Sequence, residues 1–220
     1  MTFTADNNGF LALDGTPVRR DIIAGGSAMP TPRAAVLHFT GGADGDGDTN
    51  GDRIQDAGSA PDVMRERGVS AHLVVDRDGT VIQCRSFNNT AGHAGVSRWV
   101  DPNTGRKHNG CNGFTIGIEI ANAGDDAGAQ KWAIKNAGAK VEKAAHRNEH
   151  GLKAWEVFTD AQIGAVTAIC KALVEKYNLD DITGHDCIAP ERKLDPGPLF
   201  PMQAVREACG FKGLPAVHRP

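Results

Sequence analysis

Apolar runs of strand length alternate with polar, glycine-rich stretches along the chain. Residues 34–39 form one such run. Residues 69–76 and 80–84 form two more, joined by an Asp-Arg-Asp-Gly turn, and this arrangement predicts a β-hairpin. The pattern therefore favours a sheet assembled from short strands.

Residues 114–121 show the clearest alternation of apolar and other residues. Because successive side chains of a strand point to opposite faces, we expect this segment to bury one face and present the other. The buried face carries Ile116, Ile118 and Ile120, and the opposite face carries Gly117 and Glu119.

Helical patterns occur later in the chain. Thr159 begins a Thr-Asp-Ala-Gln capping box, which predicts a helix start, and apolar residues recur at helical spacing over residues 163–177. Residues 127–147 are rich in Ala and Lys and are expected to be helical in part. We expect a loop over residues 184–197 and a short helix over residues 200–209. Interspersed strands and helices predict a single α/β domain with a mixed central sheet flanked by helices.

Composition narrows the functional classes. The chain of 220 residues has a formal net charge of -3 and a pI of about 6.2, so no basic surplus favours nucleic acid or anionic lipid. No apolar run approaches the roughly 18 residues of a membrane-spanning helix. Residues 1–15 lack the features of a secretory signal. We therefore expect a protein that is cytoplasmic as synthesised. A monomer is also expected, although no sequence feature specifies the oligomeric state.

Two histidines and one aspartate stand out from the core and surface patterns. His38 ends an apolar strand just before a glycine-rich loop, although taken alone it is better interpreted as a packed core histidine. His185 and Asp195 lie in the later polar loop. Pro196 favours extended backbone at the residue before it, so Lys193 and Asp195 are expected to point the same way. The alternative is an exposed salt bridge of little energetic value.

Together these residues predict a zinc site. Two imidazoles and a carboxylate, from His38, His185 and Asp195, form a three-ligand set that leaves a fourth position for water, as in catalytic zinc sites. Glu119 is the candidate general base, because a lone carboxylate on a buried strand is costly without a purpose. Lys193 is the candidate stabiliser of a developing oxyanion.

An acidic loop follows His38. Its spacing places oxygen ligands at the first, third and fifth positions and glycine at the sixth, as in calcium-binding loops. The twelfth position is Ala57 rather than glutamate, so we favour a solvated loop without an ion over a calcium site. The calcium ligands of the alternative are Asp46, Asp48, Asn50, Asp52 and Asp56.

Five segments resemble the zinc-dependent N-acetylmuramoyl-L-alanine amidases, a family that includes anhydromuramyl-peptide amidases, phage enzymes and peptidoglycan recognition proteins. The segments are VLHFT, VSAHLVVDRDGTVIQ, TAGHAGVSRW, CNGFTIGIEI and ITGHDCIAPERKLDPGPLF, within residues 33–203. The resemblance implies a mixed sheet flanked by helices, with zinc in an open cleft at the sheet edge. It implies an amidase catalytic domain over residues 33–210, an N-terminal lead-in over 1–32 packed on that domain, and a tail over 211–220.

The resemblance also implies roles for individual residues. His38, His185 and Asp195 match the family's zinc ligands, Glu119 matches its catalytic glutamate, and Lys193 matches the lysine beside the zinc.

Three further residues are expected near this site. His93 matches a histidine that lines the family's substrate groove, and Asn112 matches a residue that shapes the groove. His72 is expected to pack in the core or to support the ligands rather than bind the metal.

Two departures from the family pattern bear on the substrate, which the resemblance implies to be peptidoglycan or a muramoyl-peptide. Gly92 replaces the usual tryptophan, so one aromatic wall of the groove is either missing or supplied elsewhere, and Trp99 or Trp155 could substitute. Gly110 stands where recycling amidases have an arginine that grips the stem peptide. With the long segment over residues 122–158, these departures favour an endolysin-type enzyme that acts on the wall polymer once released. The alternatives are a cytoplasmic recycling amidase acting on soluble anhydromuramyl-peptides, and a peptidoglycan-binding module without hydrolysis.

Overall fold

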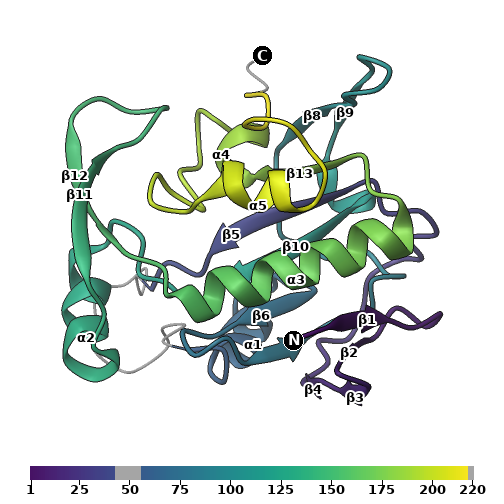
Figure 1. Ribbon diagram of the computed structural model, residues 1–220, viewed down its shortest axis with the longest axis horizontal. Helices are drawn as coiled ribbons and strands as arrows, with labels where there is room; N and C mark the ends of the chain where they lie inside the picture. Colours follow the sequence, from purple (N-terminus) through teal and green to yellow (C-terminus); the bar gives the residue numbers. More distant parts are fainter. Residues whose placement is uncertain (43–55, 218–220) are drawn as a thin grey trace.

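A mixed six-stranded sheet forms the centre of the protein (Figure 1). The computed structural model describes residues 1–42 and 56–217. In order across the sheet, the strands are β13 (Asp181–Gly184), β5 (Ala34–Phe39), β10 (Thr115–Ile120), β6 (Leu73–Val75), β7 (Val81–Gln83) and β4 (Arg19–Arg20). Strands β13, β5, β10 and β6 run parallel, β7 is antiparallel to β6, and β4 is parallel to β7.

The strands expected from the apolar runs are present, with shorter bounds in two cases. The runs 69–76 and 80–84 become β6 and β7, and they pair as an antiparallel hairpin. In the turn between them the Gly79 N–H donates to the Asp76 carbonyl over 2.9 Å, and Gly79 has a φ of +84°, a conformation that favours glycine. The predicted hairpin is therefore confirmed.

A long helix, α3 (Asp160–Tyr177), covers one face of the sheet (Figure 1). The predicted capping box is confirmed, because the Thr159 side chain accepts from the Gln162 N–H and the Gln162 side chain accepts from the Thr159 N–H. The three isoleucines of β10 are fully buried in one apolar cluster with side chains of β5 and α3. This face of the sheet is therefore closed by apolar packing.

Residues 1–32 contribute several short strands. Strands β1 (Phe3–Ala5), β2 (Leu11–Leu13) and β3 (Thr16–Pro17) form a small separate sheet. Phe3 and Leu11 are buried in the same apolar cluster as the isoleucines of β10, and β1 contacts α3. The N-terminal segment thus adds to the core beside α3.

The segment before α3 agrees with the expectation of a partly helical stretch over residues 127–147. It forms α2 (Ala127–Ala137) and then a two-stranded hairpin of β11 (Val141–Ala145) and β12 (Leu152–Glu156). Gly138, with a φ of +63°, ends α2 in a left-handed conformation. The stretch is therefore helical in part, as expected, and residues 141–145 beyond this glycine pair with β12.

The remaining elements lie around the sheet. The expectation of a loop over residues 184–197 is wrong at its start, because a single helical turn, α4 (His185–Ile188), follows β13 directly. The short helix expected over residues 200–209 is confirmed as α5 (Met202–Ala208). The other elements are α1 (Ala60–Glu66), β8 (Arg98–Val100), β9 (Lys107–Asn109) and the 3-10 turn η1 (Cys111–Gly113).

Candidate metal centre and active site

Three adjacent parallel strands bring the candidate residues together. His38 and Glu119 are register partners near the carboxyl ends of β5 and β10. His185 follows β13, whose last residue, Gly184, pairs with Leu37. Ligand sites of open α/β sheets form beyond the carboxyl ends of parallel strands, and here the polar residues lie on the face of β5 and β10 opposite α3.

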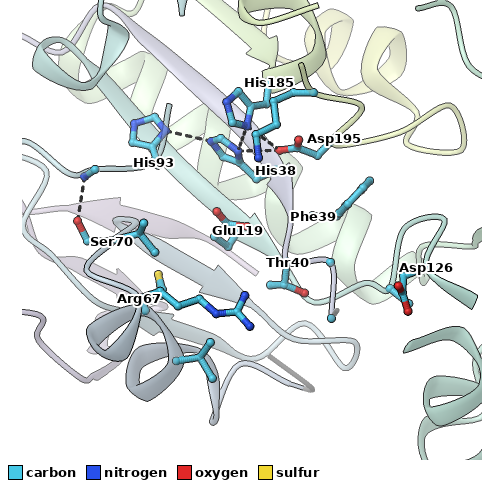
Figure 2. A pocket seen from close by; sticks show the side chains of 18 of the residues that line it. His38, Phe39, Thr40, Arg67, Ser70, His93, Glu119, Asp126, His185 and Asp195 are labelled. Atoms are coloured by element: carbon cyan, nitrogen blue, oxygen red, sulfur yellow. Dashed lines mark hydrogen bonds and ion pairs between the residues drawn. The ribbon is translucent and has the colours of Figure 1, made fainter. Parts of the chain in front are cut away.

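His38, His185 and Asp195 converge on one point (Figure 2). The Nδ1 atoms of the two histidines are 2.9 Å apart, and the Asp195 Oδ2 lies 2.8 Å from His38 Nδ1 and 2.9 Å from His185 Nδ1. The side chains are buried, with 2%, 2% and 6% of their residue surfaces exposed. Two imidazole nitrogens and a carboxylate oxygen in one buried cluster are the donor set of a zinc site with an open position.

Hydrogen bonds to the far ring nitrogens orient the two histidines. His185 Nε2 lies 3.1 Å from the Ala94 carbonyl oxygen. Because a carbonyl only accepts, Nε2 carries the proton, and Nδ1 of the neutral ring presents its lone pair to the cluster. His38 Nε2 lies 3.0 Å from His93 Nδ1. Such partners fix the tautomer of a metal-binding histidine, so the residues present fit a zinc ion.

The protonation states of the cluster also suit a metal. Burial, followed by the charge of neighbouring His185, lowers the pKa of His38 to about 4. Burial by itself raises the pKa of Asp195, but the two histidines outweigh it and hold that pKa well below its usual value. Neutral imidazole and ionised carboxylate are the forms that bind a metal.

A cleft of about 580 Å³ opens beside the cluster and is lined by Glu119 and Lys193 as well as by the three candidate ligands. Glu119 is half-buried and points into this cleft (Figure 2). Burial, together with the Asp195 carboxylate, raises the pKa of Glu119 well above its usual value, and Lys193 opposes this shift only in part. The structure therefore places all five residues expected at the catalytic site around one cleft.

His93 lines the same cleft and also supports His38 through the hydrogen bond described above. Its Nε2 lies 3.3 Å from the Thr115 carbonyl oxygen. A Cβ on Gly117 would lie 2.4 Å from the His93 ring, so this position of β10 must be glycine for the ring to fit. Sequence reasoning assigned Gly117 to the polar face but missed this role.

Asn112 holds the backbone that carries His93. Its Oδ1 accepts hydrogen bonds from the N–H groups of His93 and Ala94, over 3.1 and 2.7 Å. Asn112 itself lines an adjoining hollow of about 650 Å³ that shares Gly92 with the main cleft. The expected groove-shaping residue thus lies beside the cleft, and its side chain is used to position a loop.

His72 is fully buried beside the cleft. Its Nε2 lies 2.9 Å from the Asn89 carbonyl oxygen, and its Nδ1 accepts from the Gly117 N–H over 3.0 Å. Burial lowers its pKa to about 4. Both ring nitrogens are used within the fold, in agreement with the packing role expected from the sequence.

The aromatic side chain that lines the cleft is Phe39 rather than a tryptophan. Trp99 is fully buried in a separate apolar cluster, and Trp155 is buried behind Phe39, with ring centroids 6.4 Å apart. Neither tryptophan lines the cleft, so the alternative in which one of them substitutes for the side chain missing at Gly92 is wrong. Phe39 lines the cleft instead, and sequence reasoning missed it although it directly follows His38.

Most of the proposed calcium loop lies outside the described residues, namely Asp46, Asp48, Asn50 and Asp52. Asp56 is described, and its Oδ1 accepts from the Ser59 N–H over 2.8 Å just before α1. The described part of the loop therefore gives no support to the hypothesis of a calcium site.

An α/β sheet that gathers two histidines, two carboxylates and a lysine at one cleft is typical of metal-dependent hydrolases. Residues 28–198 match the family model described as N-acetylmuramoyl-L-alanine amidase, Amidase_2. The chain belongs to this family. The match includes every candidate ligand and catalytic residue.

Two curated relatives illustrate the similarity. The chain is 37% identical over 134 residues to 1,6-anhydro-N-acetylmuramyl-L-alanine amidase AmpD of Citrobacter freundii, which covers 60% of this chain and 52% of AmpD. It is 27% identical over 190 residues to N-acetylmuramoyl-L-alanine amidase AmiD of Escherichia coli K12, covering 82% of this chain and 54% of AmiD. The chain thus spans about half the length of these relatives.

A solved structure supports the same conclusion. The complex of AmiD from E. coli with anhydro-N-acetylmuramic acid-L-Ala-D-gamma-Glu-L-Lys superposes with a TM-score of 0.57 at 26% identity, covering 95% of this chain and 66% of AmiD. The similarity confirms the single α/β domain with a mixed sheet flanked by helices. None of the described helices is long and apolar enough to cross a membrane.

Proposed function

We propose that the protein hydrolyses the amide bond between the lactyl group of N-acetylmuramic acid and L-alanine, and that its substrate is a soluble anhydromuramyl-peptide. The observation that carries the proposal is the convergence of His38, His185 and Asp195 in one cleft with Glu119 and Lys193. The chain's membership of the amidase family supports the bond that is cleaved.

The choice of substrate rests on the relatives. The sequence departures favoured an endolysin-type enzyme acting on the wall polymer, with a recycling amidase as the alternative. The names of the matched relatives specify 1,6-anhydro-N-acetylmuramyl-L-alanine for AmpD, and the AmiD complex holds an anhydromuramyl-peptide. These findings support the alternative better than the endolysin interpretation.

His38, His185 and Asp195 would hold a zinc ion. When bound, zinc at such a site polarises the scissile carbonyl and lowers the pKa of a coordinated water to about 7. Burial lowers the pKa of His38 to about 4, so this imidazole is neutral near pH 7 and free to bind a metal.

Glu119 acts as the general base and then as the general acid. Its carboxylate takes a proton from the attacking water, and the resulting carboxylic acid gives a proton to the leaving L-alanine nitrogen. Its raised pKa suits this exchange, because the carboxyl group must hold the proton between the two steps. One water is consumed, and the products are a muramic carboxylic acid and a free peptide amine.

Lys193 stabilises the negative charge that develops on the carbonyl oxygen. It lines the cleft with Glu119 and Asp195, and its charge acts on Glu119 and His38. A fixed ammonium in a partly buried cleft stabilises the transition state more than the neutral substrate.

The test offers zinc-loaded protein two substrates side by side, anhydromuramyl-L-Ala-D-Glu-diamino acid peptide and intact peptidoglycan sacculi. Mass spectrometry of the products is expected to find free peptide and anhydromuramic acid from the soluble substrate, and much slower release from sacculi. Cleavage of sacculi alone would contradict the soluble substrate, and no cleavage of either would contradict the amidase activity.

A further inference from the structure

The hairpin of β11 and β12 contacts the chain one or two residues after each of the three candidate ligands. Trp155 of β12 packs on Phe39, the residue after His38. It also lies against Gly197, two residues after Asp195, where an added Cβ would be 3.3 Å from the Trp155 ring. The third contact is made by the turn of the hairpin and is polar.

Asp186, the residue after His185, receives this third contact. The Arg147 Nε and Nη2 atoms both donate to Asp186 Oδ2, over 2.9 and 2.7 Å, and His146 Nε2 lies 3.3 Å from the same oxygen. Asn148 Nδ2 donates to the Asp186 carbonyl over 2.8 Å. Three consecutive residues of one turn thus hold a single buried aspartate, which is only 4% exposed.

Asp186 links the turn to two of the ligands. It follows His185 in the helical turn α4, so its backbone fixes where the His185 side chain begins. Its N–H donates to the Asp195 carbonyl over 2.8 Å. A Cβ on Gly184 would lie 2.2 Å from Asp186 Oδ1, which shows how closely this backbone is packed. A shift of Asp186 would therefore move His185 and Asp195 together.

We propose that the turn of the β11–β12 hairpin braces the metal centre, with Arg147 and Asn148 as positioning residues that act on His185 and Asp195 through Asp186. Residues around a metal site that orient its ligands commonly change metal affinity when removed, by about 10- to 100-fold. The inference rests on the proposed metal centre and is independent of which muramoyl-peptide is the substrate.

The experiment measures the zinc Kd of the full chain by competition with a chromophoric chelator. The variants are Arg147→Ala, Arg147→Lys and Asn148→Ala, and the control is Lys143→Ala, which removes an exposed cation from β11 of the same hairpin. Far-ultraviolet circular dichroism and the melting temperature of each metal-free variant report whether it is folded.

The sign of the change separates positioning from charge. Removing a cation near a bound dication tightens metal binding by Coulomb's law, so a purely electrostatic role of Arg147 predicts a lower Kd for Arg147→Ala. Positioning predicts a Kd raised about 10-fold, with Arg147→Lys in between because lysine keeps the charge but cannot make both contacts. Asn148→Ala changes no charge and is expected to raise the Kd by a smaller factor.

An unchanged or lower Kd for both Arg147→Ala and Asn148→Ala would overturn the proposal, even if their melting temperatures fall, because that outcome describes a merely structural hairpin. If Arg147→Ala does not fold, the comparison of Asn148→Ala with Lys143→Ala decides alone. Wild-type protein that binds no zinc would instead contradict the proposed metal centre.

Discussion

The two faces of strands β5 and β10 are built from alternating residues of the same short segments. One face packs in the apolar core, and the other carries the candidate catalytic residues. On the face under α3, Leu37 and Ile118 are fully buried in the apolar core. On the other face, one residue further along each strand, His38 and Glu119 serve the cleft (Figure 2). Any well-packed hydrophobic neighbour can stabilise the apolar face. The buried polar groups of the other face need particular partners at hydrogen-bonding distance.

Those partners come from parts of the chain far from the strands. His38 is held by His93, which in turn is placed by Asn112 and given room by Gly117. The stability of this sheet and its chemistry can therefore be disturbed separately, by changing one face or the other.

The largest expected effect is on the polar face. Glu119→Gln keeps the shape of the side chain but removes the proton acceptor, so kcat is expected to fall by about 10²- to 10⁴-fold. Zinc content and melting temperature should stay close to those of the wild type, since glutamine fits the half-buried site. Near-normal turnover would show that Glu119 is not the base.

The matching change on the apolar face is Ile118→Ala, one residue away. It is expected to lower the free energy of unfolding by about 2–5 kcal/mol, because it leaves a cavity in a closed core. Urea denaturation measures the effect. Ile134→Ala, at a position 51% exposed on α2, is the control and should change stability by less than about 0.5 kcal/mol. Equal losses from both variants would contradict the location of the core.

Lys193→Ala changes the polar face again. It tests whether the Lys193 ammonium stabilises the negative charge that develops in the transition state. Loss of one such group typically costs about 10²- to 10³-fold in kcat. KM should change much less, because the oxyanion is absent from the bound substrate. Steady-state kinetics separate the two constants, and a change confined to KM would assign Lys193 to substrate binding instead.

The smallest effect concerns pH. Burial lowers the pKa of His72 to about 4 in the folded protein, whereas an unfolded histidine titrates near 6.5. The unfolded chain therefore takes up the proton first, and stability present above about pH 6.5 is lost as the pH falls toward 4. His72→Gln in the metal-free protein should reduce this slope, as measured by chemical denaturation at several pH values. An unchanged slope would mean that His72 does not contribute.

The sequence predicted much of the fold where periodicity is strong. The alternation around Ile116 to Ile120, the β6–β7 hairpin and the capping box of Thr159 follow from local chemistry and are confirmed. The hairpin of β11 and β12 was missed because the Ala- and Lys-rich composition favours a helix, although the two strands are neighbours in the sequence. The contacts that the hairpin makes with Phe39 and Asp186 are distant in sequence. Local propensity carries no information about these contacts.

The candidate site likewise has features that the sequence predicted and features that it did not. The grouping of His38, His185 and Asp195 was expected from residue chemistry and family resemblance, and the structure brings the three together. The roles of Gly117 and Phe39, and the burial of both tryptophans, depend on distances between loops that no local pattern encodes.

We propose that His38, His185 and Asp195 bind one zinc ion beyond the carboxyl ends of β5 and β13. Crystals of the zinc-loaded protein, with anomalous diffraction recorded on both sides of the zinc absorption edge, test it most directly. We expect a single anomalous peak within coordination distance of His38 Nδ1, His185 Nδ1 and an Asp195 carboxylate oxygen. A zinc ion bound by His72 or His93 in place of any of these three would contradict it.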